Sequence, residues 1–198
     1  MITSKEDYEE YLRADISSSY NFKEIDTVLG TVKVWLGIYE EIRFIKAMRY
    51  LEYCENVLKK NSLLGVLIWL YAKLRFKRLS IRLGYSIPIN VCGPGLSLPH
   101  RGNIIINPNS KIGANCRIHV GVNIGGHHDK APIIGDNVYI GPGAILFGNI
   151  RIANNVTIGA NATVTKSFLS ENVAIAGTPA KIIKENYKCW CDKSSDEK

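Results

Sequence analysis

Aliphatic residues recur every six positions through the second half of the chain. They form two runs separated by one interruption: Ile106, Ile112, Ile118 and Ile124, and then Ile134, Ile140, Leu146, Ile152, Ile158 and Val164. A second set lies four positions after members of the later run: Val138, Ala144, Ile150, Val156 and Ala162. An α-helix has a period of about 3.6 residues and a strand a period of about 2, so neither produces this pattern. A chain that turns a corner every six residues does, and the repeat therefore predicts a parallel β-helix with the aliphatic residues pointing toward its axis.

Glycine and asparagine mark the expected corners of these coils. Glycine follows the aliphatic residue at Gly113, Gly125, Gly135, Gly141 and Gly159, and asparagine occurs at Asn109, Asn115, Asn137, Asn154, Asn155 and Asn161. Glycine permits the backbone conformation of a tight corner, and asparagine tolerates the left-handed region of backbone space. We therefore expect both residue types to lie where the chain changes direction.

The interruption between Ile124 and Ile134 spans ten residues instead of six. A short loop over residues 126–131 is expected to leave the coil there, and inserted loops in solenoids often form a binding face. His127 and His128 lie in this loop, and His100 lies just before the coils. The fourth histidine, His119, follows Ile118 directly and is expected to be an outward-facing strand residue.

The first 83 residues have a helical pattern. All seven prolines and 14 of the 17 glycines fall between residues 84 and 179, which marks a boundary near residue 84. Before it, Tyr8, Leu12 and Ile16 step by four, a second apolar stripe runs over residues 35–49, and Asp26 or Thr27 is a candidate helix cap. The chain is thus predicted to comprise a helical domain (1–83), a β-helix (84–184) and an unstructured C-terminal tail (185–198).

Residues 63–72 are almost entirely apolar, but the stretch is too short to span a bilayer. Five cations and no acid follow it in residues 73–82. The favoured interpretation is a buried helix whose last turns carry cations, as the helix dipole prefers. The alternatives are an interfacial helix on anionic lipid, or a basic flank near a phosphorylated ligand.

Charge and cysteine content give limited information on the partners and the cellular compartment of the protein. The formal net charge of +7 favours anionic partners, but no nucleic-acid-binding motif is present. The chain opens on an acidic amphipathic stretch without the apolar core of a secretory signal. Five scattered cysteines fit a reducing cytoplasm better than a disulfide framework, and Cys189 and Cys191 are interpreted as tail residues and not metal ligands.

Several motifs within residues 84–184 resemble hexapeptide-repeat acyltransferases. They are the repeats, the Gly-Gly step at 125–126, the Ile-Gly-Pro-Gly-Ala run at 140–144 and the Ala-Gly-Thr-Pro-Ala-Lys-Ile-Ile ending at 176–183. Within that superfamily the chain is most similar to serine O-acetyltransferases, through Gly-Leu-Ser-Leu-Pro-His at 95–100 and the segment 118–126. The resemblance implies a left-handed β-helix, soluble trimers or pairs of trimers, and acetyl transfer from acetyl-CoA to a hydroxyl without a metal.

By position in that family, His100 is the general base. A neutral imidazole can take the proton of a hydroxyl as it attacks a thioester, and backbone N–H groups at a corner can hold the resulting oxyanion. Galactoside and xenobiotic acetyltransferases of the same superfamily carry the base on the interruption loop instead, which corresponds to His127 or His128. These two residues and Asp129 are also the candidate acceptor contacts.

The resemblance implies that acetyl-CoA, the acetyl donor, binds along the last coils. Gly141, Pro142, Ala160, Thr165 and Lys166 match pantetheine-side contacts, and Lys181 and Lys184 match cations that meet the CoA phosphates.

Three departures from the serine enzymes affect the acceptor. Pro99 replaces the acid before the histidine, no acid lies near Tyr85 to orient the imidazole, and Ala131 replaces a histidine that helps bind the amino acid. The acceptor is therefore either a small amino acid such as serine or a sugar hydroxyl. A non-catalytic β-helix scaffold is a third possibility, and a nucleotide-sugar N-acyltransferase a fourth.

Overall fold

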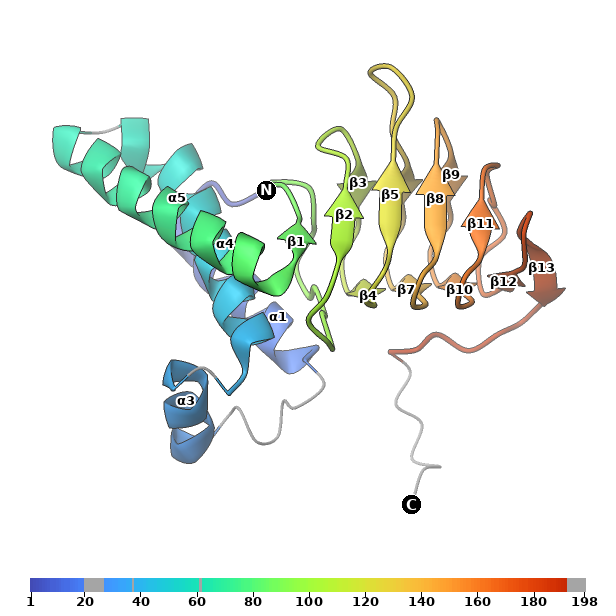
Figure 1. The fold of residues 1–198 in the computed structure, drawn as a ribbon, viewed down its shortest axis with the longest axis horizontal. Coiled ribbons are helices and arrows are strands. Elements are labelled where there is room, and N and C mark those ends of the chain that lie inside the picture. The colour runs from blue at the N-terminus through green and yellow to red at the C-terminus, as the bar shows by residue number, and fades with distance from the viewer. Residues whose placement is uncertain (20–26, 37, 61, 192–198) are drawn as a thin grey trace.

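Among the described residues, four α-helices precede a stack of coils built from very short strands (Figure 1). The structure is a computed structural model, and it describes residues 1–19, 27–36, 38–60 and 62–191. The helices are α1 (Lys5–Ser17), α3 (Val28–Trp35), α4 (Glu40–Asn56) and α5 (Leu63–Leu83), with a 3₁₀ turn, η1 (Leu58–Lys60), before α5.

Side-chain caps fix where these helices begin. Ser4 and Asp7 form a reciprocal capping box on α1, and the Thr27 hydroxyl accepts a hydrogen bond from the Gly30 N–H at the start of α3. Thr27 is therefore the predicted cap; Asp26 lies outside the described residues. The predicted stripe over 35–49 does not belong to one helix, because α3 ends at Trp35 and α4 begins at Glu40.

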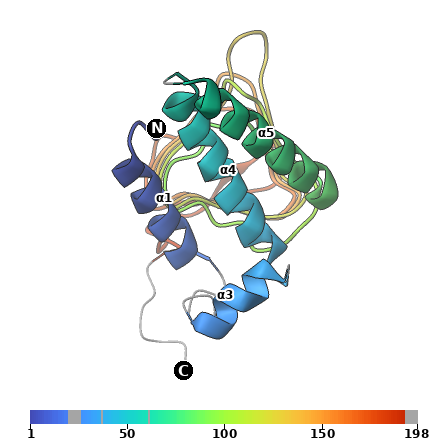
Figure 2. The same cartoon turned by 90° about the vertical axis from the view of Figure 1, so that its left-hand side faces the viewer.

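The helices lie over one end of the coils, where α1, α4 and α5 sit side by side (Figure 2). Phe44 of α4 packs its ring 4.8 Å from that of Tyr85, at the first strand. Phe44 and Met48 belong to the same buried cluster as Leu83, Ile104 and the inward residues of the later coils. Helices and coils therefore share one hydrophobic core.

The strands form three sheets around the coil axis. The first contains β1 (Tyr85–Ser86), β2 (Ile104–Ile106), β5 (Asn123–Gly125), β8 (Ile145–Phe147) and β11 (Thr163–Val164). The second contains β3 (Lys111–Ile112), β6 (Ile133–Ile134) and β9 (Arg151–Ile152). The third contains β4 (Arg117–Ile118), β7 (Tyr139–Ile140), β10 (Thr157–Ile158), β12 (Ala174–Ala176) and β13 (Lys181–Lys184). Among the named strands of the described residues, only the β12–β13 pair is antiparallel, and the whole is the predicted left-handed parallel β-helix.

The register of the sheets reproduces the six-residue repeat. In the first sheet Ile106 pairs with Ile124, Ile124 with Leu146, and Leu146 with Val164. All of these aliphatic residues are buried, as is the second set that begins at Val138. Paired residues are 18 positions apart from Ile106 to Ile124 and 22 apart from Ile124 to Leu146, so one turn holds four extra residues. Those residues form the predicted loop.

The corners agree with the prediction for four of the six asparagines and differ for glycine. Asn115, Asn137, Asn155 and Asn161 adopt left-handed backbone conformations, whereas Asn109 and Asn154 do not. The glycines after the aliphatic residues do not have positive φ; a Cβ on Gly135 would instead lie 2.9 Å from the Ala153 carbonyl carbon of the next coil. Glycine is therefore needed there because neighbouring coils approach closely.

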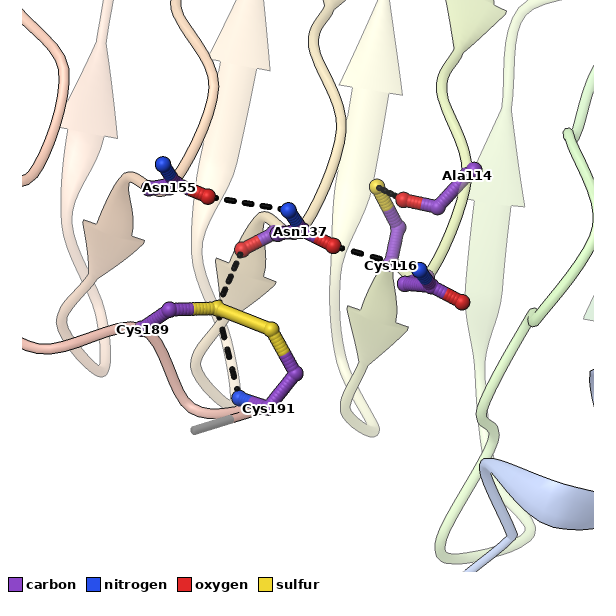
Figure 3. The surroundings of a disulfide bond; sticks show 7 residues. Ala114, Cys116, Asn137, Asn155, Cys189 and Cys191 are labelled. Atoms are coloured by element: carbon purple, nitrogen blue, oxygen red, sulfur yellow. Dashed lines mark hydrogen bonds between the residues drawn. A yellow bond between two sulfur atoms is a disulfide. The ribbon is translucent and has the colours of Figure 1, made fainter. Parts of the chain in front are cut away.

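The prediction of an unstructured C-terminal tail is wrong as far as Cys191. As far as Cys191 the chain packs back against the coils: the Tyr187 N–H donates to the Asn172 carbonyl, and Cys189 is buried beside Asn137 (Figure 3). Cys189 and Cys191 form a disulfide, so the expectation of unpaired cysteines is wrong for this pair. Their neighbour Trp190 lies under the Arg117 guanidinium, 4.1 Å from its ring centre.

The interpretation of residues 63–82 as a buried helix is also wrong. Leu63 and Leu67 are 78% and 58% exposed, because only one side of α5 packs on α4 and the coils. Among the described residues, the structure contains no helix with the length and hydropathy needed to cross a membrane.

Candidate active site

The candidate site residues lie along two different edges of the coil stack. The His100 edge comprises residues 100–103, 119–121, 141–143, 159–161 and 177–178, at the corner between the third and first sheets. Backbone hydrogen bonds join its layers: Gly121 donates to Asn103 (2.6 Å), Gly143 to Val120 (2.9 Å) and Asn161 to Pro142 (2.9 Å). The loop edge comprises residues 126–131, 147–149 and 165–166, at the corner between the first and second sheets.

His100 is exposed, and its main chain is held from both sides. The Tyr85 hydroxyl donates a 2.9 Å hydrogen bond to the His100 carbonyl oxygen. Burial raises the pKa of Tyr85 above its usual range, so the phenol keeps its proton for this bond. The next residue, Arg101, pairs with the buried carboxylate of Glu40 on α4 (3.3 Å), and Arg82 of α5 pairs with the same carboxylate (2.5 Å). The helical part thus positions the segment that carries His100.

His119 lies beside His100, although the sequence indicated only an outward strand residue. Its ring centre is 6.1 Å from that of His100 and 4.9 Å from that of Tyr139. The ring is half-buried, and its Nε2 atom is buried without a hydrogen-bond partner among the described residues. Burial, helped by the nearby Arg117, lowers the pKa of His119, so this imidazole is neutral at pH 7.

No hydrogen bond reaches the His100 ring from the part of the chain that the structure describes. Tyr85, which lies in the region where an orienting acid was expected, therefore contacts the main chain of His100 and not its ring. The sequence signal that could have found Tyr85 is its place about fifteen residues before His100, where the serine enzymes carry an acid.

The loop edge carries the second group of candidates. The loop folds into a small hairpin in which His127 and Lys130 exchange backbone hydrogen bonds (2.8 and 3.2 Å). The His127 and His128 rings lie 4.1 Å apart. Together with Asp129, they border a hollow of about 530 Å³ that also contacts Phe147 and Thr165. The loop edge can therefore hold a small ligand on one chain.

The residues assigned to the donor divide between these edges. Gly141, Pro142 and Ala160 continue the His100 edge, while Thr165 and Lys166 lie on the loop edge. Lys181 and Lys184 are exposed on β13, at the end of the stack. Across the described ranges, no three His, Cys, Asp or Glu side chains gather as they would around a metal ion.

Replacing Tyr85 with phenylalanine is expected to lower kcat by about 2- to 10-fold, the equivalent of one lost hydrogen bond, with little change in the KM for acetyl-CoA. The phenol holds the His100 carbonyl but lies away from the residues assigned to the donor. Steady-state kinetics of the variant would measure both constants. An equal change in kcat and in the affinity for acetyl-CoA would contradict a role confined to positioning His100.

Known proteins resemble this chain in its coil region. Residues 131–166 match the family described as bacterial transferase hexapeptide (six repeats). A serine acetyltransferase of Staphylococcus aureus strain Mu50 is 39% identical over 98 residues, which cover 48% of this chain and 46% of that protein. The chain thus spans about half the length of the curated relatives it matches.

Solved structures extend the likeness to the helical part. A serine acetyltransferase of Neisseria gonorrhoeae aligns with a TM-score of 0.72 at 25% identity, covering 98% of this chain and 74% of that one. A serine acetyltransferase solved in complex with CoA has the same fold, with a TM-score of 0.64 at 23% identity over 90% of this chain and 70% of that one. The resemblance inferred from the motifs is therefore confirmed.

Proposed function

We propose that this chain transfers an acetyl group from acetyl-CoA to a hydroxyl of a small acceptor. The observation that carries the proposal is the His100 edge, which aligns His100 with Gly141, Pro142 and Ala160, the positions assigned to the donor. Relatives named serine acetyltransferase, one of them solved with CoA, support the same reaction class.

In the proposed mechanism His100 is the general base. The acceptor oxygen attacks the carbonyl carbon of the thioester while its proton passes to the imidazole. Backbone N–H groups at the corner hold the tetrahedral oxyanion until the C–S bond breaks. The CoA thiolate then leaves and recovers the proton from the imidazolium, so the base is regenerated within one turnover.

We propose that the complete site forms between neighbouring copies in a homotrimer. The His100 edge and the loop edge occupy different corners of one chain, so the loop hollow does not face His100 within that chain. A cyclic arrangement brings one edge of each copy against the other edge of the next. Outward apolar residues support such an interface: Ile105, Ile133, Ile145 and Phe147 are each 36–46% exposed.

Lys181 and Lys184 are the proposed partners of the CoA phosphates, and Lys166 is a proposed contact of the pantetheine arm. Lys181 and Lys184 are exposed on β13 at the end of the stack and carry the charge that a phosphate requires. The formal net charge of +7 is consistent with an anionic donor. Action in the cytoplasm, where acetyl-CoA is made, remains a prediction from the sequence.

Two acceptor classes remain in the proposal, serine and a sugar hydroxyl. Overall similarity favours serine. The sugar is favoured by Ala131, which is buried at the position where the serine enzymes carry an acceptor-binding histidine. The loop hollow, with two imidazoles and one carboxylate, offers the hydrogen-bonding groups that a polyol needs.

The test offers acetyl-CoA to the purified chain with serine and, separately, with a panel of sugars, and follows the release of free thiol. We expect acceptor-dependent thiol release with one class, and a raised KM for that acceptor in a His127→Asn/His128→Asn variant. If acetyl-CoA neither binds nor turns over with any acceptor, the scaffold interpretation replaces the enzymatic one.

A further inference from the structure

The outward face of α5 is apolar along its whole length. Five residues on one line of the helix are between 47% and 78% exposed: Leu63, Leu67, Leu70, Leu74 and Ile81. Their spacings of four, three, four and seven place them on the same side of a helix. The opposite side, with Ala72, Leu79 and Leu83, is buried. An apolar stripe on the side away from the core indicates a surface that binds something.

Cations border this stripe, and α5 contains no acid. Lys73, Arg75, Lys77, Arg78 and Arg82 are all exposed. Arg82 pairs with Glu40, and Lys73 lies over the Trp69 ring. Within the described residues, Lys77, Arg75 and Arg78 have no ion-pair partner. Their charges are therefore available to an anionic partner.

An apolar hollow of about 470 Å³ opens beside the same face. Its walls include Phe76 and Ile89, and Lys73, Lys77 and Glu55 also line it, the carboxylate of Glu55 being paired with a lysine of η1. An apolar space next to two ammonium groups suits an amphiphile with a hydrocarbon part and an anionic head.

We propose that α5 docks this protein on the surface of an anionic lipid bilayer. The leucine stripe would enter the boundary between headgroups and acyl chains, and the bordering cations would contact lipid phosphates. A second copy is the weaker fit, because a twofold contact between two α5 faces would bring like charges together. The proposal concerns location and does not depend on the acetyl transfer proposed above.

The test is co-sedimentation of the full chain with vesicles of phosphatidylcholine alone or of phosphatidylcholine mixed with phosphatidylglycerol. We expect binding to the anionic vesicles that weakens with added salt. The variant Lys77→Glu/Arg78→Glu is expected to bind at least about tenfold more weakly, since each cation near the surface contributes to binding. Leu67→Glu/Leu70→Glu is expected to lose binding, because charged side chains do not enter the acyl boundary.

Matched controls change the same residue types elsewhere. Lys111→Glu/Arg151→Glu reverses two exposed cations of the coils, and Leu169→Glu changes a 72% exposed leucine. Both controls should bind the anionic vesicles about as well as the unchanged chain. The proposal is overturned if the unchanged chain does not sediment with anionic vesicles, if controls and α5 variants lose binding equally, or if the leucine variant instead lowers the oligomeric mass measured by light scattering.

Discussion

Replacing Arg49 with methionine is expected to lower the free energy of unfolding by about 3–5 kcal/mol. The Arg49 side chain is fully buried between α1, α4 and the first coil. Its guanidinium donates to both oxygens of Asp15 (2.8 and 3.3 Å) and to Glu52 (2.9 Å). It also donates to the carbonyl oxygens of Cys92 (2.9 Å) and Gly93 (2.6 Å). One side chain therefore joins three parts of the fold.

The expected loss of stability arises because methionine would leave two buried carboxylates without their guanidinium partner. Asp15 and Glu52 are buried, and each also accepts from the backbone: Asp15 from the Leu96 N–H (2.8 Å) and Glu52 from the Asn90 N–H (2.7 Å). Burial alone lowers the pKa of Arg49, but the two acids outweigh burial and raise it, so the guanidinium keeps its charge. Without that charge, two acids remain buried with too few donors.

Urea denaturation of the variant and the unchanged chain measures this difference. Arg13→Met, the same substitution at an exposed position of α1, is the control and should change stability by no more than about 0.5 kcal/mol. Adding Asp15→Asn and Glu52→Gln to Arg49→Met should recover part of the loss, because the buried charges are removed. A midpoint unchanged by Arg49→Met would show that the network contributes little.

This network also shows where sequence reasoning stops. The coils were predictable because each inward residue repeats at a fixed spacing, and the loop because it breaks that spacing. The contact of Asp15 with Leu96 joins residues 81 positions apart with no repeat to reveal it. The contact between Tyr85 and His100 has no repeat to reveal it either. The resemblance to the serine enzymes shows only that the acid expected near Tyr85 is missing.

The predictions for residues 63–72 and for the C-terminal tail were wrong for a different reason. Residues 63–72 are apolar on every side, so periodicity cannot say which side faces the core, and an almost wholly apolar run reads as buried. The tail has no periodicity at all, yet Cys189 and Trp190 pack against the coils through contacts that depend on the neighbouring chain surface. In both segments, contacts with the rest of the fold, and not the local sequence pattern, determine which side chains are buried.

Replacing His100 with asparagine is expected to reduce kcat by about 10²- to 10⁴-fold, which is the contribution of a general base to a proton transfer. Because His100 is exposed, the variant should fold normally, with a circular dichroism spectrum and a urea midpoint like those of the unchanged chain. The residues assigned to the donor lie in other layers of the stack, so calorimetry should show nearly unchanged affinity for acetyl-CoA.

The variants His127→Asn and His119→Asn separate the alternatives for the base. If His100 is the base, His127→Asn should mainly raise the KM of the acceptor, since that residue borders the loop hollow. His119→Asn should have a smaller effect on kcat than His100→Asn, because the His119 ring lies 6.1 Å from that of His100 and its Nε2 is buried. If His100→Asn retains full turnover while a loop variant loses it, the base lies on the loop, as in the galactoside and xenobiotic acetyltransferases. Acetyl transfer would then take place in the loop hollow beside Phe147. His100 would have only a structural role on the His100 edge.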